Sequence, residues 1–201
     1  MLARRRALSA DVVARNSALV VERLRNLPEL AGAGTVGAYL GIRGEVDPSG
    51  LMGPETPDGP DGTFAGGVLA GQVALPVTTP GEQLRFVVPT GPLEEGPFGI
   101  RQPGIGPGRG EELDPMDLNV VLVPLVATDR RGNRIGHGAG FYDRTFARVA
   151  ELRQEGTQGS REPAPLLIGV CHGFQVVDAL SPRPWDVSLD LVVTEVGITR
   201  S

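Results

Sequence analysis

Three glycines at every second position, Gly136, Gly138 and Gly140, make one segment of the sequence especially suited to bind a ligand. Glycine lets the backbone approach a ligand closely and turn successive N–H groups toward it, an arrangement that suits phosphate. Arg134 could add a fork of donors, and Asp143 could hold a divalent cation against the phosphates. The spacing is neither the dinucleotide fingerprint nor a Walker A loop. On the glycines alone, a turn that binds nothing explains the pattern equally well.

The elements around these glycines follow from the pattern of apolar residues. Residues 120–123 form a continuous apolar run, which is typical of a strand buried on both faces. A polar turn over residues 129–133 follows, and the spacing from Phe141 to Leu152 predicts a helix. The predicted order is therefore strand, glycine loop and helix, and the N-terminus of that helix would add a partial positive charge.

The segment DRRGNRIGHGAGFYDR, residues 129–144, resembles the signature of the 5-formyltetrahydrofolate cyclo-ligase family. Further similarities lie in ARRRALSAD near the start, AYLGIRGEVD at residues 38–47, FGIRQP at 98–103 and PWDVSLDLVVTE at 184–195. The resemblance covers most of the chain and is weakest over residues 49–71. It implies an ATP-dependent ligase that converts 5-formyltetrahydrofolate into 5,10-methenyltetrahydrofolate and releases ADP and phosphate. It further implies that the formyl oxygen attacks the γ-phosphate and that N10 then attacks the activated carbon.

The same resemblance implies a role for each matching residue. Arg134 and Tyr142 are expected to act in catalysis, and Asp143 and Asp186 are expected to hold Mg²⁺. The residues expected to bind ATP are Arg134, Ile135, Gly136, His137, Gly138, Ala139, Gly140, Phe141 and Tyr142. Those expected to bind the reduced folate are Leu40, Glu45, His137, Gly138, Ala139, Gly140 and Phe141.

Simpler explanations exist for several polar residues. Taken alone, Asp186 is an ordinary turn aspartate and Glu45 a solvated loop residue; the resemblance favours a functional role for both, and a carboxylate suits the donor-rich edge of a pterin. His137 is expected to line the site without acting as a base, and His172 to be a satisfied residue at a strand end. The run from Arg4 to Arg6 is best explained as a solvated helix end.

Composition narrows the function independently. The chain has 201 residues, a net charge of -5 and one cysteine, and all 19 of its basic Lys or Arg residues are arginine. The acidic balance argues against nucleic acid or an anionic membrane as partner, and no apolar run approaches the ~20 residues of a membrane span. Without lysine there can be no Walker A lysine and no Schiff base. A single cysteine agrees with a cytoplasmic protein, and we expect a monomer.

The predicted fold is one α/β domain over residues 1–201. A first helix begins after the N-cap Ser9 and is closed by Pro28. Strands are expected at residues 35–40, 72–77, 83–88, 120–123, 166–170 and 189–194, and a further helix near 175–180. Alternating strands and helices indicate a mostly parallel central sheet with an antiparallel edge formed by residues 72–88. The resemblance adds a Rossmann-like, three-layer α/β/α sandwich. Residues 49–71, rich in glycine and proline, are predicted to be a flexible loop.

Two alternatives stay open. One is a non-catalytic nucleotide- or folate-binding module on the same fold; the weaker one is a sugar-phosphate isomerase or CoA-transferase-like enzyme. The resemblance also implies a basic segment upstream of Met1 that contacts ATP phosphates. Either translation starts upstream, or ATP binding is weakened or rearranged.

Overall fold

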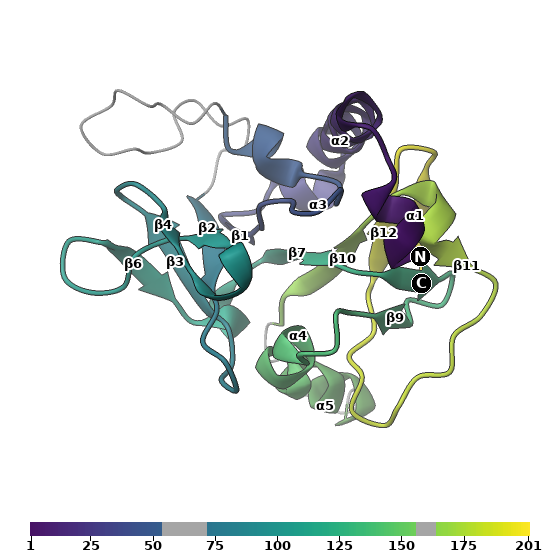
Figure 1. Cartoon of the computed structure of the whole chain (residues 1–201). Coiled ribbons are helices and arrows are strands. Elements are labelled where there is room, and N and C mark those ends of the chain that lie inside the picture. Colours follow the sequence, from purple (N-terminus) through teal and green to yellow (C-terminus); the bar gives the residue numbers. More distant parts are fainter. Residues whose placement is uncertain (54–71, 156–163) are drawn as a thin grey trace.

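The computed structural model describes residues 1–53, 72–155 and 164–201. They form an eight-stranded sheet between two layers of helices (Figure 1). The strand order is β13 (Ile198–Arg200), β12 (Leu191–Val193), β10 (Leu166–Val170), β7 (Val120–Pro124), β1 (Thr35–Gly37), β2 (Gln72–Val77), β3 (Arg85–Pro89) and β6 (Gly110–Leu113). Two small sheets accompany it: β11 (Val176–Val177), β8 (Ala127–Asp129) and β9 (Arg134–Ile135), and the pair β4 (Glu94–Glu95) and β5 (Arg101–Gln102).

The central strands of the large sheet are parallel, which confirms the predicted fold class. Strands β12, β10, β7, β1 and β2 all run in the same direction. The predicted hairpin of β2 and β3 forms one antiparallel edge, extended by β6. The opposite edge of the sheet is also antiparallel, because β13 pairs with β12 there. This edge was not predicted, since residues 189–194 were expected to form the last strand.

Side chains of β7 show why the sheet is covered on both sides. Val120 and Leu122 belong to a core cluster with Val20 and Leu24 of α2 (Ala10–Arg25). Val121 and Val123 belong to a second cluster with Phe146 and with Val149 of α5 (Ala147–Glu155). Since successive strand residues point to opposite faces, the apolar run buries one set against each layer.

The first helical layer differs from the prediction at both ends. A short α1 (Leu2–Arg6) precedes α2, whose first turn is capped by the Ser9 hydroxyl as predicted. However, α2 ends at Arg25, and Pro28 opens a separate short α3 (Pro28–Ala31) instead of closing the first helix. Proline fits there because its missing N–H is not needed in a first helical turn.

Three further predictions of secondary structure are wrong in extent or type. The helix expected over residues 141–152 is divided at Phe146 into α4 (Phe141–Thr145) and α5. At the end of α4, the Thr145 hydroxyl donates to the carbonyl of Phe141 and accepts the N–H of Leu84. The helix expected near 175–180 is a single 3₁₀ turn, Gly173–Gln175, followed by β11. Strand β1 stops at Gly37, three residues short of the predicted end.

Short 3₁₀ turns complete the described structure. They lie at Pro48–Leu51, Pro97–Gly99, Pro115–Asp117 and Gly173–Gln175. The predicted flexible loop begins in the first of these, and its residues 54–71 lie outside the described part of the chain. In the described ranges, no helix combines the length and apolarity needed to cross a membrane.

Candidate active site

The functional residues gather where the parallel strands end. The chain leaving β1 leads to Glu45, the chain leaving β7 leads through β8 and β9 to the glycine loop, and the chain leaving β10 leads to His172. Strands β1 and β7 are neighbours, so both of their extensions emerge at one edge of the sheet. The carboxyl edge of an open α/β sheet is its usual ligand-binding edge.

Arg134 and Asp143 form the buried pair at the base of the glycine loop. Arg134 Nη2 donates to Asp143 Oδ1 at 2.6 Å, and only 4 % of the arginine side chain is exposed. Burial lowers the pKa of Arg134, while the charges of Asp143 and Asp186 oppose that shift. The Nε of Arg134 is buried and has no hydrogen-bond partner among the described residues. A buried donor without a partner is costly, so this atom indicates a place for a ligand oxygen.

Asp143 also brings Asp186 to the site. The backbone N–H of Val187 donates to Asp143 Oδ1 at 3.2 Å, which places the neighbouring Asp186 beside the pair. Asp186 Oδ2 accepts the N–H of Arg183 at 2.8 Å, as an ordinary turn aspartate does. Within the described structure, Asp143 Oδ2 and Asp186 Oδ1 accept no hydrogen bond. Two carboxylates with free oxygens therefore lie near one arginine.

The glycine loop owes its shape to two residues with positive φ. Gly138 has φ +91° and Gly140 has φ +66°, a region that residues with a Cβ rarely adopt. The loop is fixed from outside by Arg144, whose Nη1 donates to the carbonyl of Ala139 at 2.7 Å and whose Nε and Nη2 donate to the carbonyl of Glu82. The loop therefore has a defined backbone path, although Gly138 and Ala139 are exposed.

Glu45 lies next to His137 of the glycine loop and is buried rather than solvated. Its Oε1 lies 3.1 Å from Arg5 Nη1 and 3.3 Å from His137 Nε2, and its Oε2 accepts the N–H of Ile42 at 3.2 Å. Burial raises the pKa of Glu45, and the charge of Arg5 is the main effect that opposes it. The explanation of residues 4–6 as a solvated helix end is therefore wrong for Arg5, which is 1 % exposed.

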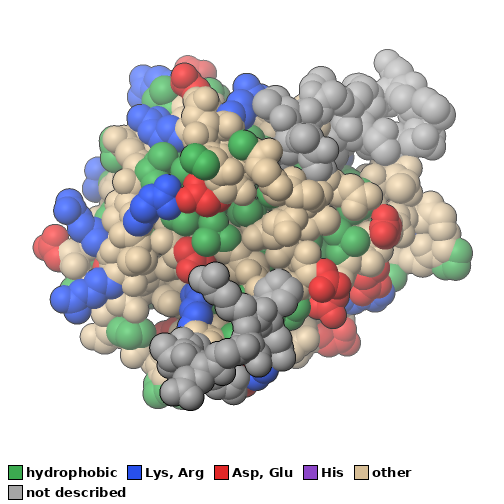
Figure 2. Space-filling model, turned by 180° about the vertical axis from the view of Figure 1, so that it is seen from behind, with side chains coloured by type: hydrophobic (Ala, Val, Ile, Leu, Met, Phe, Trp, Pro, Cys, Tyr) green, Lys and Arg blue, Asp and Glu red, His purple; other side chains and the backbone are tan. Residues whose placement is uncertain are grey.

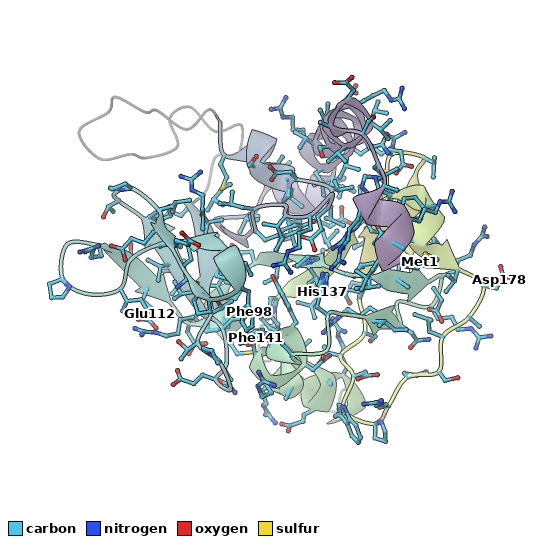
Figure 3. The ribbon with its side chains drawn as sticks, in the orientation of Figure 1. Met1, Phe98, Glu112, His137, Phe141 and Asp178 are labelled. Atoms are coloured by element: carbon cyan, nitrogen blue, oxygen red, sulfur yellow. The ribbon has the colours of Figure 1, made fainter. Side chains whose placement is uncertain are left out.

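Two aromatic side chains, Phe98 and Phe141, pack against each other at the helix that follows the glycine loop. Phe98 and Phe141 meet edge to face with ring centroids 6.4 Å apart, and Figure 3 shows them side by side with His137 between them and α1. Phe98 is 54 % exposed and has φ +66°, and its carbonyl accepts a hydrogen bond from Arg43. Sequence analysis did not single out Phe98, because its ring partner lies 43 positions away.

Three further predicted site residues differ in how far they are buried: Tyr142 and Leu40 are half-buried and Ile135 is exposed. Tyr142 packs against Phe146 and lies 5.8 Å below the guanidinium of Arg134, and burial raises the pKa of its phenol above the usual range. Leu40 is half-buried against the core, whereas Ile135 is 49 % exposed.

Of the two histidines, His172 has the environment predicted for it, and the role of His137 stays a prediction. His172 is fully buried and satisfied, as predicted, by Asn16 and the carbonyl of Gly44. His137 is exposed, and its Nε2 lies 3.1 Å from Arg5 Nη2. Partial burial lowers its pKa, and the charges of Arg5 and Arg43 act in the same direction.

Two of the cavities bordered by described residues have no glycine-loop residue in their lining. One, of about 790 Å³, is bordered by Glu82 and Arg144, and the other, of about 760 Å³, lies beside α2 and is bordered by Gly44 and Asp47. The groups able to do chemistry are the buried polar side chains around the loop, which do not border these cavities. Basic and acidic side chains are interspersed on the face drawn in Figure 2, with no continuous basic surface there.

Gly44 provides a stability test for the turn that carries Glu45. Its φ is +78°, and a Cβ would lie 2.7 Å from the carbonyl oxygen of Arg5. Gly81 has φ +86° with nothing within 4 Å of such a Cβ, so Gly81→Ala is a matched control for backbone strain. We expect Gly44→Ala to lower the free energy of unfolding by about 1 kcal/mol more than Gly81→Ala, because α1 must move. Urea denaturation measures the difference, and equal losses would show that α1 does not press on this turn.

Several known proteins are similar to this chain. A model described as the 5-formyltetrahydrofolate cyclo-ligase family matches residues 1–195. A 5-formyltetrahydrofolate cyclo-ligase of Escherichia coli is 30 % identical over 95 % of this chain and 94 % of its own length, and one of Haemophilus influenzae is 33 % identical over 55 % of this chain and 52 % of its own length. The solved 5,10-methenyltetrahydrofolate synthetase of Aquifex aeolicus superposes with a TM-score of 0.70 at 29 % identity, covering 99 % of this chain and 88 % of that one. The resemblance predicted from residues 129–144 is confirmed.

Proposed function

This chain belongs to the 5-formyltetrahydrofolate cyclo-ligase family, and we propose that it converts 5-formyltetrahydrofolate and ATP into 5,10-methenyltetrahydrofolate, ADP and phosphate. The observation that carries the proposal for the site is the buried guanidinium of Arg134 with an unpartnered Nε at the base of the glycine loop. The glycine motif predicts the terminal phosphate of ATP beside this guanidinium.

In the first half of the reaction, the formyl oxygen forms a bond to the γ-phosphorus while the bond to the β,γ-bridging oxygen breaks and ADP leaves. Phosphoryl transfer of this kind needs alignment and charge neutralisation more than covalent help. Arg134 and the N–H groups of the glycine loop would stabilise the charge on the transferring group. Tyr142 keeps its proton at neutral pH and would serve as a wall and a donor rather than as a base.

In the second half, N10 attacks the activated formyl carbon, the carbon–oxygen bond to phosphate breaks, and the N10 proton is released. The substrate must hold N10 close to that carbon, which requires a fixed pterin. Glu45 would accept N–H groups of the pterin edge, and Phe141 would pack against its ring, together with Leu40 and the backbone of residues 137–140. The edge-to-face contact of Phe98 with Phe141 supports an apolar wall there.

Asp143 and Asp186 fit a magnesium ion. Mg²⁺ usually takes one or two protein carboxylates and completes its shell with water and substrate phosphates. Each of these residues has one oxygen without a hydrogen bond in the described structure, which suits that pattern. No cluster of three or more His, Cys, Asp or Glu suitable for a metal is present among the described residues. The ion, when bound, supplies charge neutralisation for the phosphates.

Further parts of the proposal concern the state of the protein. We propose a cytoplasmic monomer that uses reduced folate and ATP and no nucleic acid. A single cysteine and the net charge of -5 support this proposal.

An absorbance assay for the methenyl product tests the activity. We expect product only when 5-formyltetrahydrofolate, ATP and Mg²⁺ are all present, with ADP formed in equal amount. Tight folate binding by calorimetry without turnover would instead support the non-catalytic module. Absence of both binding and turnover would reject the proposal.

A further inference from the structure

We infer that Arg5 is a positioning residue of the folate-binding half of the site, where it fixes the carboxylate of Glu45 and joins it to His137 of the glycine loop. This inference rests on the proposed function, since it takes Glu45 to contact the folate. Nothing in the sequence separates Arg5 from its two arginine neighbours.

The burial of Arg5 distinguishes it from the rest of α1. Arg4 and Arg6 are exposed, and the guanidinium of Arg4 lies 4.3 Å above the ring of Phe174. Arg5 is 1 % exposed and is directed at the carboxyl edge of the sheet. Its Nε is buried and has no hydrogen-bond partner in the described part of the chain. A charge in such a place is costly unless it is paired, so its partners define what it does.

Those partners come from three segments far apart in the sequence. Nη1 pairs with Glu45 Oε1 at 3.1 Å and donates to the carbonyl of Leu125 at 3.4 Å. Nη2 lies 3.1 Å from His137 Nε2, and that nitrogen lies 3.3 Å from Glu45 Oε1. One guanidinium therefore connects the Glu45 turn, the end of β7 and the glycine loop.

The backbone of the same turn is held as well. Gly44 packs directly against the carbonyl of Arg5, and its own carbonyl lies 2.9 Å from the ring nitrogen of His172. His172 is in turn bonded to Asn16 of α2 at 3.0 Å. The turn before Glu45 is thus fixed from both sides, and Arg5 is the group that fixes the carboxylate itself.

The carboxylate of Glu45 keeps an acceptor position that a substrate could use. A carboxylate offers about four acceptor positions on its two oxygens. Arg5 Nη1 takes one position on Oε1, and the N–H of Ile42 takes one position on Oε2. One position on Oε2 is left for an N–H donor, in an orientation that Arg5 sets. A buried pair of this kind adds little stability compared with apolar residues, which favours a role in positioning.

Steady-state kinetics of Arg5→Met, Glu45→Gln and the double variant test the inference. We expect Arg5→Met to raise the KM for 5-formyltetrahydrofolate at least tenfold while the KM for ATP stays within twofold. Because both single changes act on one contact, the double variant should have a folate KM within twofold of Glu45→Gln alone. Arg6→Met, an exposed arginine on the same helix, should leave both KM values within twofold.

Three outcomes overturn the inference. They are an unchanged folate KM in Arg5→Met, an equal rise in its KM values for folate and ATP, or a folate KM in the double variant that rises by the product of the two single-variant factors. If Arg5→Met does not fold, the test uses the double variant, which buries no unpaired charge. Its folate KM should lie within twofold of the folate KM of Glu45→Gln, and a larger difference overturns the inference. If the wild type has no turnover, the proposed function fails separately. The same variants are then compared by calorimetric binding of 5-formyltetrahydrofolate, with the same tenfold criterion applied to Kd.

Discussion

Replacement of Arg134 by alanine is expected to lower kcat/KM for ATP by about 30- to 900-fold, which corresponds to about 2–4 kcal/mol of transition-state stabilisation. The guanidinium is 4 % exposed and has an unpartnered Nε, so its interaction with phosphate would take place away from water. An electrostatic donor in such surroundings has more effect than an exposed one. Most of the loss should appear in kcat, because the charge on the transferring group is greatest in the transition state.

Arg131→Ala is the matched control for this result. Arg131 is an exposed arginine three residues earlier in the same turn, and it bonds to Asp129 only through its backbone N–H. We expect its kcat/KM to stay within twofold of wild type. An Arg134→Ala enzyme that also stays within twofold would show that Arg134 is not the phosphate-binding residue.

Replacement of Asp143 by asparagine is expected to lower the free energy of unfolding by about 3 kcal/mol. Asparagine keeps an oxygen for the N–H of Val187 but removes the charge that pairs directly with the buried Arg134. Glu112→Gln is the control, because Glu112 pairs with Arg85 while both side chains are 39–47 % exposed. Such surface pairs contribute about 0–1 kcal/mol, so urea denaturation should separate the two variants. Equal losses would show that the Arg134–Asp143 pair is not effectively buried.

The Asp143→Asn variant also tests the proposed magnesium site. If Asp143 and Asp186 both hold the ion, Asp143→Asn and Asp186→Asn should each raise the half-saturating Mg²⁺ concentration at least tenfold. Asp186 is the cleaner of the two, because among the described residues its side chain bonds only to the N–H of Arg183 in a turn. An unchanged magnesium titration for Asp186→Asn would leave Asp143 as the sole protein ligand in the proposal.

Sequence patterns predicted the parts of the structure that local chemistry determines. The apolar run of residues 120–123 predicted a strand buried on both faces, and its side chains do divide between two core clusters. The glycines of residues 136–140 predicted a loop of unusual backbone, and two of the three have positive φ. The family followed from the same motif and is confirmed by the match over residues 1–195. The roles of the individual site residues stay predictions.

What could not be predicted depends on contacts between distant residues. The run of three arginines looks alike in sequence, yet Arg5 alone meets a buried carboxylate 40 positions away. The 3₁₀ turn at Gly173–Gln175 replaced a predicted helix because Gln175 is used instead to bond the N–H of His172 and the carbonyls of Leu125 and Val126. Such tertiary hydrogen bonds can outweigh the weak helical propensity of a six-residue segment.

The long sequence separations of these contacts have a consequence for refolding. Arg5 and His137 are 132 positions apart, and Asp143 and Val187 are 44 apart, so the site closes only after several large loops have formed. Contacts between distant segments form slowly because loop closure must precede them. In a stopped-flow experiment from urea, far-ultraviolet circular dichroism should recover before catalytic activity. Destabilising α1 should lengthen the interval between the two signals.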